Sequence, residues 1–175
     1  VKYTPLQLEA GGGARIITQY EMHASEEVGL IKLDILGIYN LTILANAVKI
    51  VEALHDVKIN IKKVPLDDKD TYEMLAKGET FGVFQLSGSG MTKYLMDLHP
   101  ERIEDLMAMV ALYRPGPMGF IPEYIERKRD PSKVQYFVPG LEKILDQSYG
   151  IITYQDDVLF MAIQLAGYNW EEADK

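Results

Sequence analysis

Cysteine is absent from the sequence, so disulfide bonds, thiolate–zinc sites, iron–sulfur clusters and cysteine nucleophiles are all excluded. The lack of cysteine also fits a reducing compartment, and we expect a cytoplasmic location. No apolar run approaches the roughly 20 residues that a membrane-spanning helix needs, which excludes an integral membrane protein. Basic residues are the minority: 18 Lys and Arg stand against 26 Asp and Glu, and the formal charge of −8 argues against a self-sufficient nucleic-acid-binding domain.

The sequence does contain enough apolar material for a buried core. Its 175 residues are 47% hydrophobic and include eleven Tyr, eight Met and five Phe, which suits one domain or two small ones. The chain starts without an initiator Met or a signal-peptide core, and its last residues, 170–175, resemble the first turn of a helix. We therefore expect both ends to have been cut from a longer protein.

An apolar run rich in β-branched residues, 28–36, predicts a strand. With a period of two, Ile31, Leu33 and Ile35 share one face of this strand. Lys32 and Asp34 share the opposite face, about 6–7 Å apart along the strand. The glycine triplet at 11–13 predicts a surface loop.

From Asn40 onward the hydrophobic period becomes helical, and Asn40 and Asp67 are the predicted caps of the first two helices. A short strand is expected at 81–86, an extended segment at 149–154, and a loop or short strand at 58–63. The expected helices cover 41–54, 91–98, 103–113, 121–128 and 156–166. A further helix is expected to start within 65–70 and to end at Gly78. Together these elements predict an α+β fold that is predominantly helical.

Two charged residues are candidates for a functional site. Asp34 lies within an apolar run, although aspartate is disfavoured in strands. A buried carboxylate needs a cation, so Asp34 is either a metal ligand or the partner of Lys32 on a solvated edge. Arg114 stands on a turn among prolines and glycine, where it suits phosphate binding or, alternatively, an interaction with the dipole of the preceding helix. The residues alone leave both pairs of alternatives open.

Other motifs favour structural roles. Residues 154–157 match the Tyr-x-Asp-Asp signature of reverse transcriptases, but the two aspartates open a helix, where carboxylates act as caps. His23, His55 and His99 show no metal-ligand spacing. The basic run 127–129 either contacts phosphate or forms a solvated helix end.

Seven sequence blocks stand out along the chain: Thr18-Gln-Tyr-Glu-Met22, Gly29-Leu-Ile-Lys-Leu-Asp-Ile-Leu-Gly37, Pro65-Leu-Asp-Asp68, Gly82-Val-Phe-Gln-Leu86, Ala111-Leu-Tyr-Arg-Pro-Gly-Pro117, Tyr149-Gly-Ile-Ile-Thr-Tyr-Gln155 and Ala166-Gly-Tyr168. In their order and spacing these blocks resemble the C-family replicative DNA polymerases, the family of the alpha subunit of bacterial DNA polymerase III. The resemblance covers nearly the whole chain, and several unrelated blocks in register argue against a chance match.

The resemblance implies a division into domains and a set of site residues. Residues 1–38 would be the C-terminal part of the palm, at the end of its β-sheet, and residues 39–175 the N-terminal part of a helix-rich fingers region. Asp34 falls on the third catalytic aspartate of the palm, a metal ligand. Lys32 falls on the basic residue near the incoming triphosphate, and Arg114 is a further candidate for nucleotide or triphosphate binding.

The resemblance also implies the chemistry and the partners. Two Mg²⁺ ions would support template-dependent nucleotidyl transfer from deoxynucleoside triphosphates onto a primer. The partners would be primer–template DNA and other replicase subunits such as the sliding clamp, with no membrane. The 175 residues alone are expected to be inactive because they carry one of the three aspartates. The alternative is a non-catalytic interaction or scaffold module derived from this family.

Overall fold

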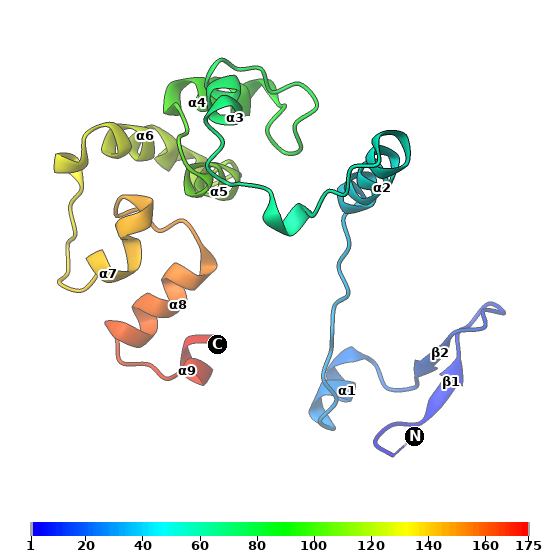
Figure 1. Cartoon of the computed structure of the whole chain (residues 1–175). Coiled ribbons are helices and arrows are strands. Elements are labelled where there is room, and N and C mark those ends of the chain that lie inside the picture. Colours follow the sequence, from blue (N-terminus) through cyan, green and yellow to red (C-terminus); the bar gives the residue numbers. More distant parts are fainter. Residues whose placement is uncertain (1, 175) are drawn as a thin grey trace. The chain divides into compact units, whose positions relative to one another are not determined.

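The computed structural model describes residues 2–174, and these fall into two compact units that divide between Ile59 and Asn60 (Figure 1). The elements confirm a predominantly helical α+β fold with one small sheet. The predicted boundary between palm and fingers, after residue 38, stays a prediction. None of the described helices has both the length and the apolar character needed to cross a membrane.

The first unit begins with a β-hairpin. Strands β1 (Leu6–Leu8) and β2 (Ile16–Thr18) pair antiparallel, with Leu6 opposite Thr18. The predicted glycine loop at 11–13 is confirmed as the connection. Gly11 and Gly12 have φ angles of 93° and 86°, a region that only glycine adopts without strain.

Two helices follow the hairpin, α1 (Met22–Glu27) and α2 (Tyr39–His55). Glu21 caps α1, because its carboxylate accepts hydrogen bonds from the backbone N–H groups of Ala24 and His23 at 2.6 and 3.0 Å. These hydrogen bonds lower the pKa of Glu21. The helix expected from Asn40 is confirmed as α2, but Ile38 is its N-cap and no side chain caps it, so the prediction of an Asn40 cap was wrong.

The predicted strand at 28–36 is not formed, and this part of the sequence prediction was wrong. The segment between α1 and α2 has no regular structure, and Ile31, Leu33 and Ile35 are 85%, 82% and 98% exposed. A strand is stable only when its backbone groups pair with a neighbouring strand. Among the described residues, the sheet consists of β1 and β2 alone, so this segment has no strand to pair with.

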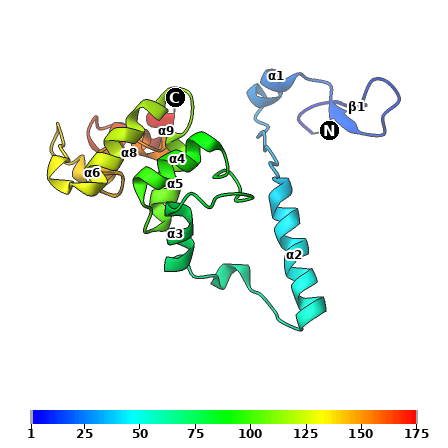
Figure 2. The same ribbon diagram turned by 90° about the horizontal axis from the view of Figure 1, so that it is seen from above.

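The second unit holds the buried core. Helix α4 contacts both α3 and α6, and α8 contacts both α7 and α9. Figure 2 gives a second view of the helices of this unit, from above. They are α3 (Lys69–Ala76), α4 (Ser89–Leu98), α5 (Ile103–Leu112), α6 (Ile121–Arg129), α7 (Glu142–Leu145), α8 (Gln155–Gln164) and α9 (Trp170–Asp174). The largest buried apolar side chains, each at most 2% exposed, are Leu75, Leu95, Leu98, Met109, Leu112, Ile121 and Tyr124. Burial of each such side chain contributes about 1.5–3 kcal/mol to the free energy of unfolding.

The helices expected over the second unit are confirmed, whereas the extended segments are not. Residues 81–86 form turns, because Gly82 and Gln85 adopt φ angles of 77° and 61° that interrupt an extended chain. Tyr149 is likewise left-handed, with φ 54°, and 149–154 forms no strand. Residues 61–63 form a short 3-10 helix, η1 (Ile61–Lys63). The cap of α3 is Asp68, one residue beyond the predicted Asp67, and it accepts a hydrogen bond from the Thr71 N–H at 3.0 Å.

Candidate functional site

Lys32 and Asp34 are brought together in the first unit, on the irregular segment between α1 and α2. The Lys32 Nζ lies 3.2 Å from the Asp34 Oδ2, and the two side chains are 48% and 60% exposed. Within residues 2–174, Asp34 has no other ion pair or hydrogen bond. The sequence left two alternatives for Asp34, and this contact is the expected one with Lys32, while the role of Asp34 as a metal ligand stays a prediction. It leaves the remaining surface of the Asp34 carboxylate open to a further ligand.

Arg114 lies in the second unit, on the turn that ends α5. Its backbone N–H donates to the Leu112 carbonyl at 2.7 Å, and Gly116 holds φ 105° two residues later. The Arg114 side chain is exposed and makes no hydrogen bond or ion pair with the described residues. It lines an open groove of about 470 Å³ whose other walls include Phe84, Met107 and Tyr154.

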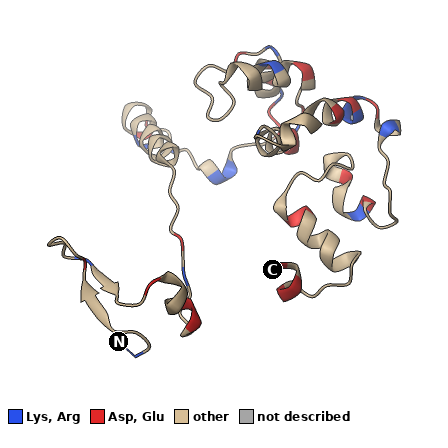
Figure 3. Ribbon diagram, turned by 180° about the vertical axis from the view of Figure 1, so that it is seen from behind, with Lys and Arg blue, Asp and Glu red and all other residues tan. Residues whose placement is uncertain are grey.

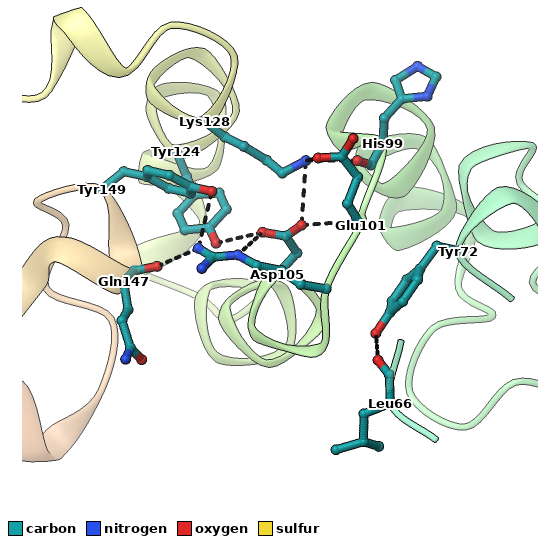
Figure 4. A network of polar contacts seen from close by, with 10 residues as sticks. Leu66, Tyr72, His99, Glu101, Asp105, Tyr124, Lys128, Gln147 and Tyr149 are labelled. Carbon is teal, nitrogen blue, oxygen red and sulfur yellow. Dashed lines mark hydrogen bonds and ion pairs between the residues drawn. The ribbon is translucent and has the colours of Figure 1, made fainter. Parts of the chain in front are cut away.

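A buried carboxylate that the sequence prediction missed lies at the start of α5. Asp105 has no exposed surface, and it accepts a hydrogen bond from the Glu101 N–H at 3.0 Å. Two cations neutralise it: the Arg102 Nε lies 3.3 Å from Oδ1, and the Lys128 Nζ lies 3.4 Å from Oδ2 (Figure 4). Every buried side-chain nitrogen and oxygen among the described residues has a hydrogen-bonding partner. The sequence signal was Asp105 inside an apolar helix, three residues after Arg102.

Two tyrosines complete the surroundings of Asp105. The Tyr124 hydroxyl donates to Asp105 Oδ1 at 3.4 Å, and its ring packs edge-on against Tyr149 with 5.2 Å between centroids. Burial raises the pKa of the Tyr124 hydroxyl above its ordinary value, and the negative charge of Asp105 raises it further. The Arg102 guanidinium donates to the Tyr149 hydroxyl at 3.1 Å and to the Gln147 carbonyl at 3.0 Å.

The three basic side chains at 127–129 donate hydrogen bonds to backbone carbonyls of the second unit. Arg127 donates to the Tyr149 carbonyl at 2.9 Å, and Lys128 donates to the His99 carbonyl at 2.9 Å. Arg129 donates to the Asp97 carbonyl. Acidic and basic residues both lie along α6 (Figure 3). The side chains of Arg127 and Lys128 are 11% and 10% exposed, whereas Arg129 is exposed, so only the last residue of the run forms a solvated helix end. The alternative of a phosphate contact stays a prediction.

The predicted capping role of the aspartate pair at 156–157 is confirmed for Asp157. Its Oδ2 accepts hydrogen bonds from the backbone N–H groups of Thr153 and Tyr154, both at 2.8 Å, at the start of α8. Within the described part of the chain, no group of three or more His, Asp or Glu side chains gathers as a metal site. Asp34, the metal ligand that the resemblance implies, is therefore not part of such a group among these residues, and its role as a ligand stays a prediction.

Known proteins resemble this chain over nearly its whole length. The family model of the bacterial DNA polymerase III alpha subunit finger domain matches residues 40–175. The DNA polymerase III subunit alpha of Halalkalibacterium halodurans is 46% identical over 169 residues, which are 97% of this chain and 15% of that protein. The subunit of Staphylococcus aureus strain COL is 43% identical over 173 residues, which are 99% of this chain and 16% of that protein.

These matches confirm the family resemblance seen in the sequence blocks, and they show that the chain spans about 15–16% of the length of these curated relatives. The finger model covers α2 from its second residue and the whole described part of the second unit, and it includes Arg114. Lys32 and Asp34 precede it and lie within the segment that the two relatives share with this chain. The chain belongs to the family of bacterial DNA polymerase III alpha subunits, with the finger domain at residues 40–175.

Proposed function

We propose that these residues act as part of a replicative DNA polymerase in the bacterial cytoplasm. The polymerase adds deoxynucleotides to a primer as its template directs. The observation that carries the proposal is the match of residues 40–175 to the finger domain of polymerase III alpha subunits. The identity of 43–46% over nearly the whole chain supports it. Its partners in this proposal are primer–template DNA, deoxynucleoside triphosphates and other replicase subunits such as the sliding clamp.

Asp34 is the proposed catalytic carboxylate and metal ligand. Mg²⁺ prefers carboxylate oxygens, and the Asp34 side chain is 60% exposed with Lys32 as its one contact among the described residues. The donor type therefore fits Mg²⁺, while the number of donors does not complete a two-metal site. When bound in such a site, Mg²⁺ activates the attacking hydroxyl and stabilises the charge on the phosphates.

Lys32 and Arg114 are the proposed contacts to the nucleotide. The Lys32 ammonium already lies 3.2 Å from Asp34, so it stands beside the carboxylate that would hold the metal. A cation at this point offsets the negative charge of a triphosphate and of the leaving pyrophosphate. The exposed Arg114 guanidinium has its donors open in the groove after α5, and its planar fork matches the geometry of phosphate oxygens.

Primer extension with two proteins tests this proposal. One is the isolated chain, and the other is a full-length alpha subunit that carries the same residues. We expect the full-length subunit to extend a primer in the presence of Mg²⁺ and the isolated chain to give no product, because one carboxylate does not complete the two-metal site. Robust synthesis by the isolated chain would overturn the assignment of Asp34 as one part of a larger site. A full-length subunit that binds DNA without extending the primer would favour a non-catalytic module instead.

A further inference from the structure

One face of α5 lines the groove that contains Arg114. Residues three or four apart lie on the same face of a helix, and Ile103, Leu106 and Val110 are spaced in this way before Arg114. Tyr154, on the segment that leads into α8, forms part of the wall of the same groove. Residues 84–86 form the rest of the wall. The groove therefore lies between α5, residues 84–86 and Tyr154, and its form depends on how the segment that ends at Tyr154 is held against α5.

Arg102 holds the segment 147–154 against the start of α5. As the N-cap residue of α5, it reaches the Gln147 carbonyl and the Tyr149 hydroxyl with the same guanidinium nitrogen, at 3.0 and 3.1 Å. The guanidinium carbon also lies 5.3 Å from the centre of the Tyr149 ring, within the range of a cation–π contact. These contacts join residues that are 45 and 47 positions apart in the chain.

Asp105 orients Arg102 from within the helix. Its Oδ1 accepts from the Arg102 Nε at 3.3 Å, while its Oδ2 is held by the Glu101 N–H and by Lys128. A carboxylate without exposed surface is costly to leave unpaired, so this arrangement resists rearrangement. Asp105 therefore holds the Arg102 guanidinium group in place on one side. On its other side, the guanidinium group binds Gln147 and Tyr149.

We infer that Arg102, oriented by Asp105, is a positioning residue that sets the groove in which Arg114 contacts the phosphates of the incoming nucleotide. The inference rests on the proposed function, because it assigns Arg114 to nucleotide binding. Arg102 touches neither the nucleotide nor Arg114. It acts by holding Tyr154 and its segment at the correct distance from α5, and release of this contact displaces a wall of the groove.

A double-mutant cycle in a full-length alpha subunit tests the inference. The variants are Arg102→Lys, Arg114→Lys and the pair, and the measurements are kcat and the KM for the incoming nucleotide. We expect each single substitution to raise KM by about tenfold or more, since small displacements of a binding group have large effects. We expect the KM of the double variant to be no higher than that of the weaker-binding single variant, because both changes weaken the same contact, that of Arg114 with phosphate.

The choice of Lys at position 102 keeps a cation beside Asp105, so the fold is retained. Tyr149→Phe is the second variant, because it removes one acceptor of Arg102 and keeps the ring that packs on Tyr124. It should raise KM in the same direction. Arg15→Lys is the matched control: Arg15 is 82% exposed and pairs with Glu9 in the first unit, so KM should stay unchanged.

The outcomes separate the inference from the proposed function. A merely structural Arg102 would lower the amount of active enzyme, and thus kcat, while KM stayed the same. That result, or multiplication of the two single effects in the double variant, would overturn the inference and leave the polymerase assignment standing. A normal KM in Arg114→Lys would also overturn it. If the unmodified full-length subunit incorporated no nucleotide at all, the proposed function and this inference would both fail.

Discussion

Lys128 on α6 places its ammonium nitrogen 3.4 Å from the Oδ2 of Asp105 on α5, and the two side chains are 10% and 0% exposed. This ion pair joins two helices that also share the apolar core around Met109 and Tyr124. Removal of one partner leaves the other charge buried, which costs more than the pair itself contributes. The second unit should therefore be sensitive to changes at Asp105.

Asp105→Ala should lower the free energy of unfolding of the isolated chain by about 3–5 kcal/mol, because Lys128 and Arg102 lose their buried counter-charge. Urea unfolding followed by far-UV circular dichroism measures the change. Glu101→Gln is the control: its carboxylate also pairs with Lys128, at 3.2 Å, but it is 82% exposed. We expect a loss below about 1 kcal/mol for this control. Equal losses in the two variants would contradict the structural role of the buried pair.

Tyr124→Phe should change how stability depends on alkaline pH. The pKa of Tyr124 is raised in the folded chain by burial and by the charge of Asp105. Its contribution to stability is therefore fully present below the ordinary tyrosine pKa of about 10. The contribution is lost as the pH rises from there toward the folded-state pKa, because the unfolded chain releases this proton first. In Tyr124→Phe the urea midpoint should fall less steeply above that pH, and an unchanged slope would argue against the burial of this hydroxyl.

Gly78→Ala should destabilise the second unit, because Gly78 follows α3 with φ 80° and a Cβ there would lie 2.8 Å from the sulfur of Met96. The backbone conformation and the contact together predict a loss of more than about 1 kcal/mol. Gly119→Ala is the matched control, since a Cβ at Gly119 meets no atom within 4 Å and its φ is not in the left-handed region. Thermal unfolding of both variants compares the two sites. A similar melting temperature for the two would show that Gly78 is not constrained in this way.

The helices of the second unit were predictable from the sequence because their signals are local. The apolar spacing of Met91, Leu95 and Leu98 lies on one face of α4, and each of these side chains is at most 2% exposed. The left-handed Gly78 marks the end of α3 in the sequence and in the structure. Caps were less predictable: adjacent residues, such as Asp67 and Asp68, are chemically equal candidates and differ only in the backbone angles that folding gives them.

The strand prediction at 28–36 failed for a physical reason. Alternation of Ile31, Lys32 and Leu33 is a property of the segment, whereas strand formation needs a second backbone that the alternation does not specify. The Lys32–Asp34 contact was predictable because it joins residues two positions apart. Asp105 was missed because Tyr124 and Lys128, which surround it, come from a different helix. The sequence prediction included no contact between α5 and α6, so it gave no reason to place a buried charge there.

We propose that Asp34 is the catalytic carboxylate that this chain contributes to a polymerase. The most direct test is the rate of single-nucleotide incorporation by a full-length alpha subunit carrying Asp34→Asn, with Asp56→Asn as the control. Asp56 is also exposed and lies in the same unit, and its left-handed backbone, with φ 53°, is one that asparagine readily adopts. Because the Asp34 side chain is 60% exposed and contacts only Lys32 among the described residues, its change to Asn should alter the free energy of unfolding by less than about 1 kcal/mol.

We predict that Asp34→Asn lowers the incorporation rate by at least about 100-fold, while Asp56→Asn keeps the rate of the unmodified subunit. An Asp34→Asn subunit that is folded and incorporates nucleotide at a near-normal rate would contradict the catalytic role of Asp34.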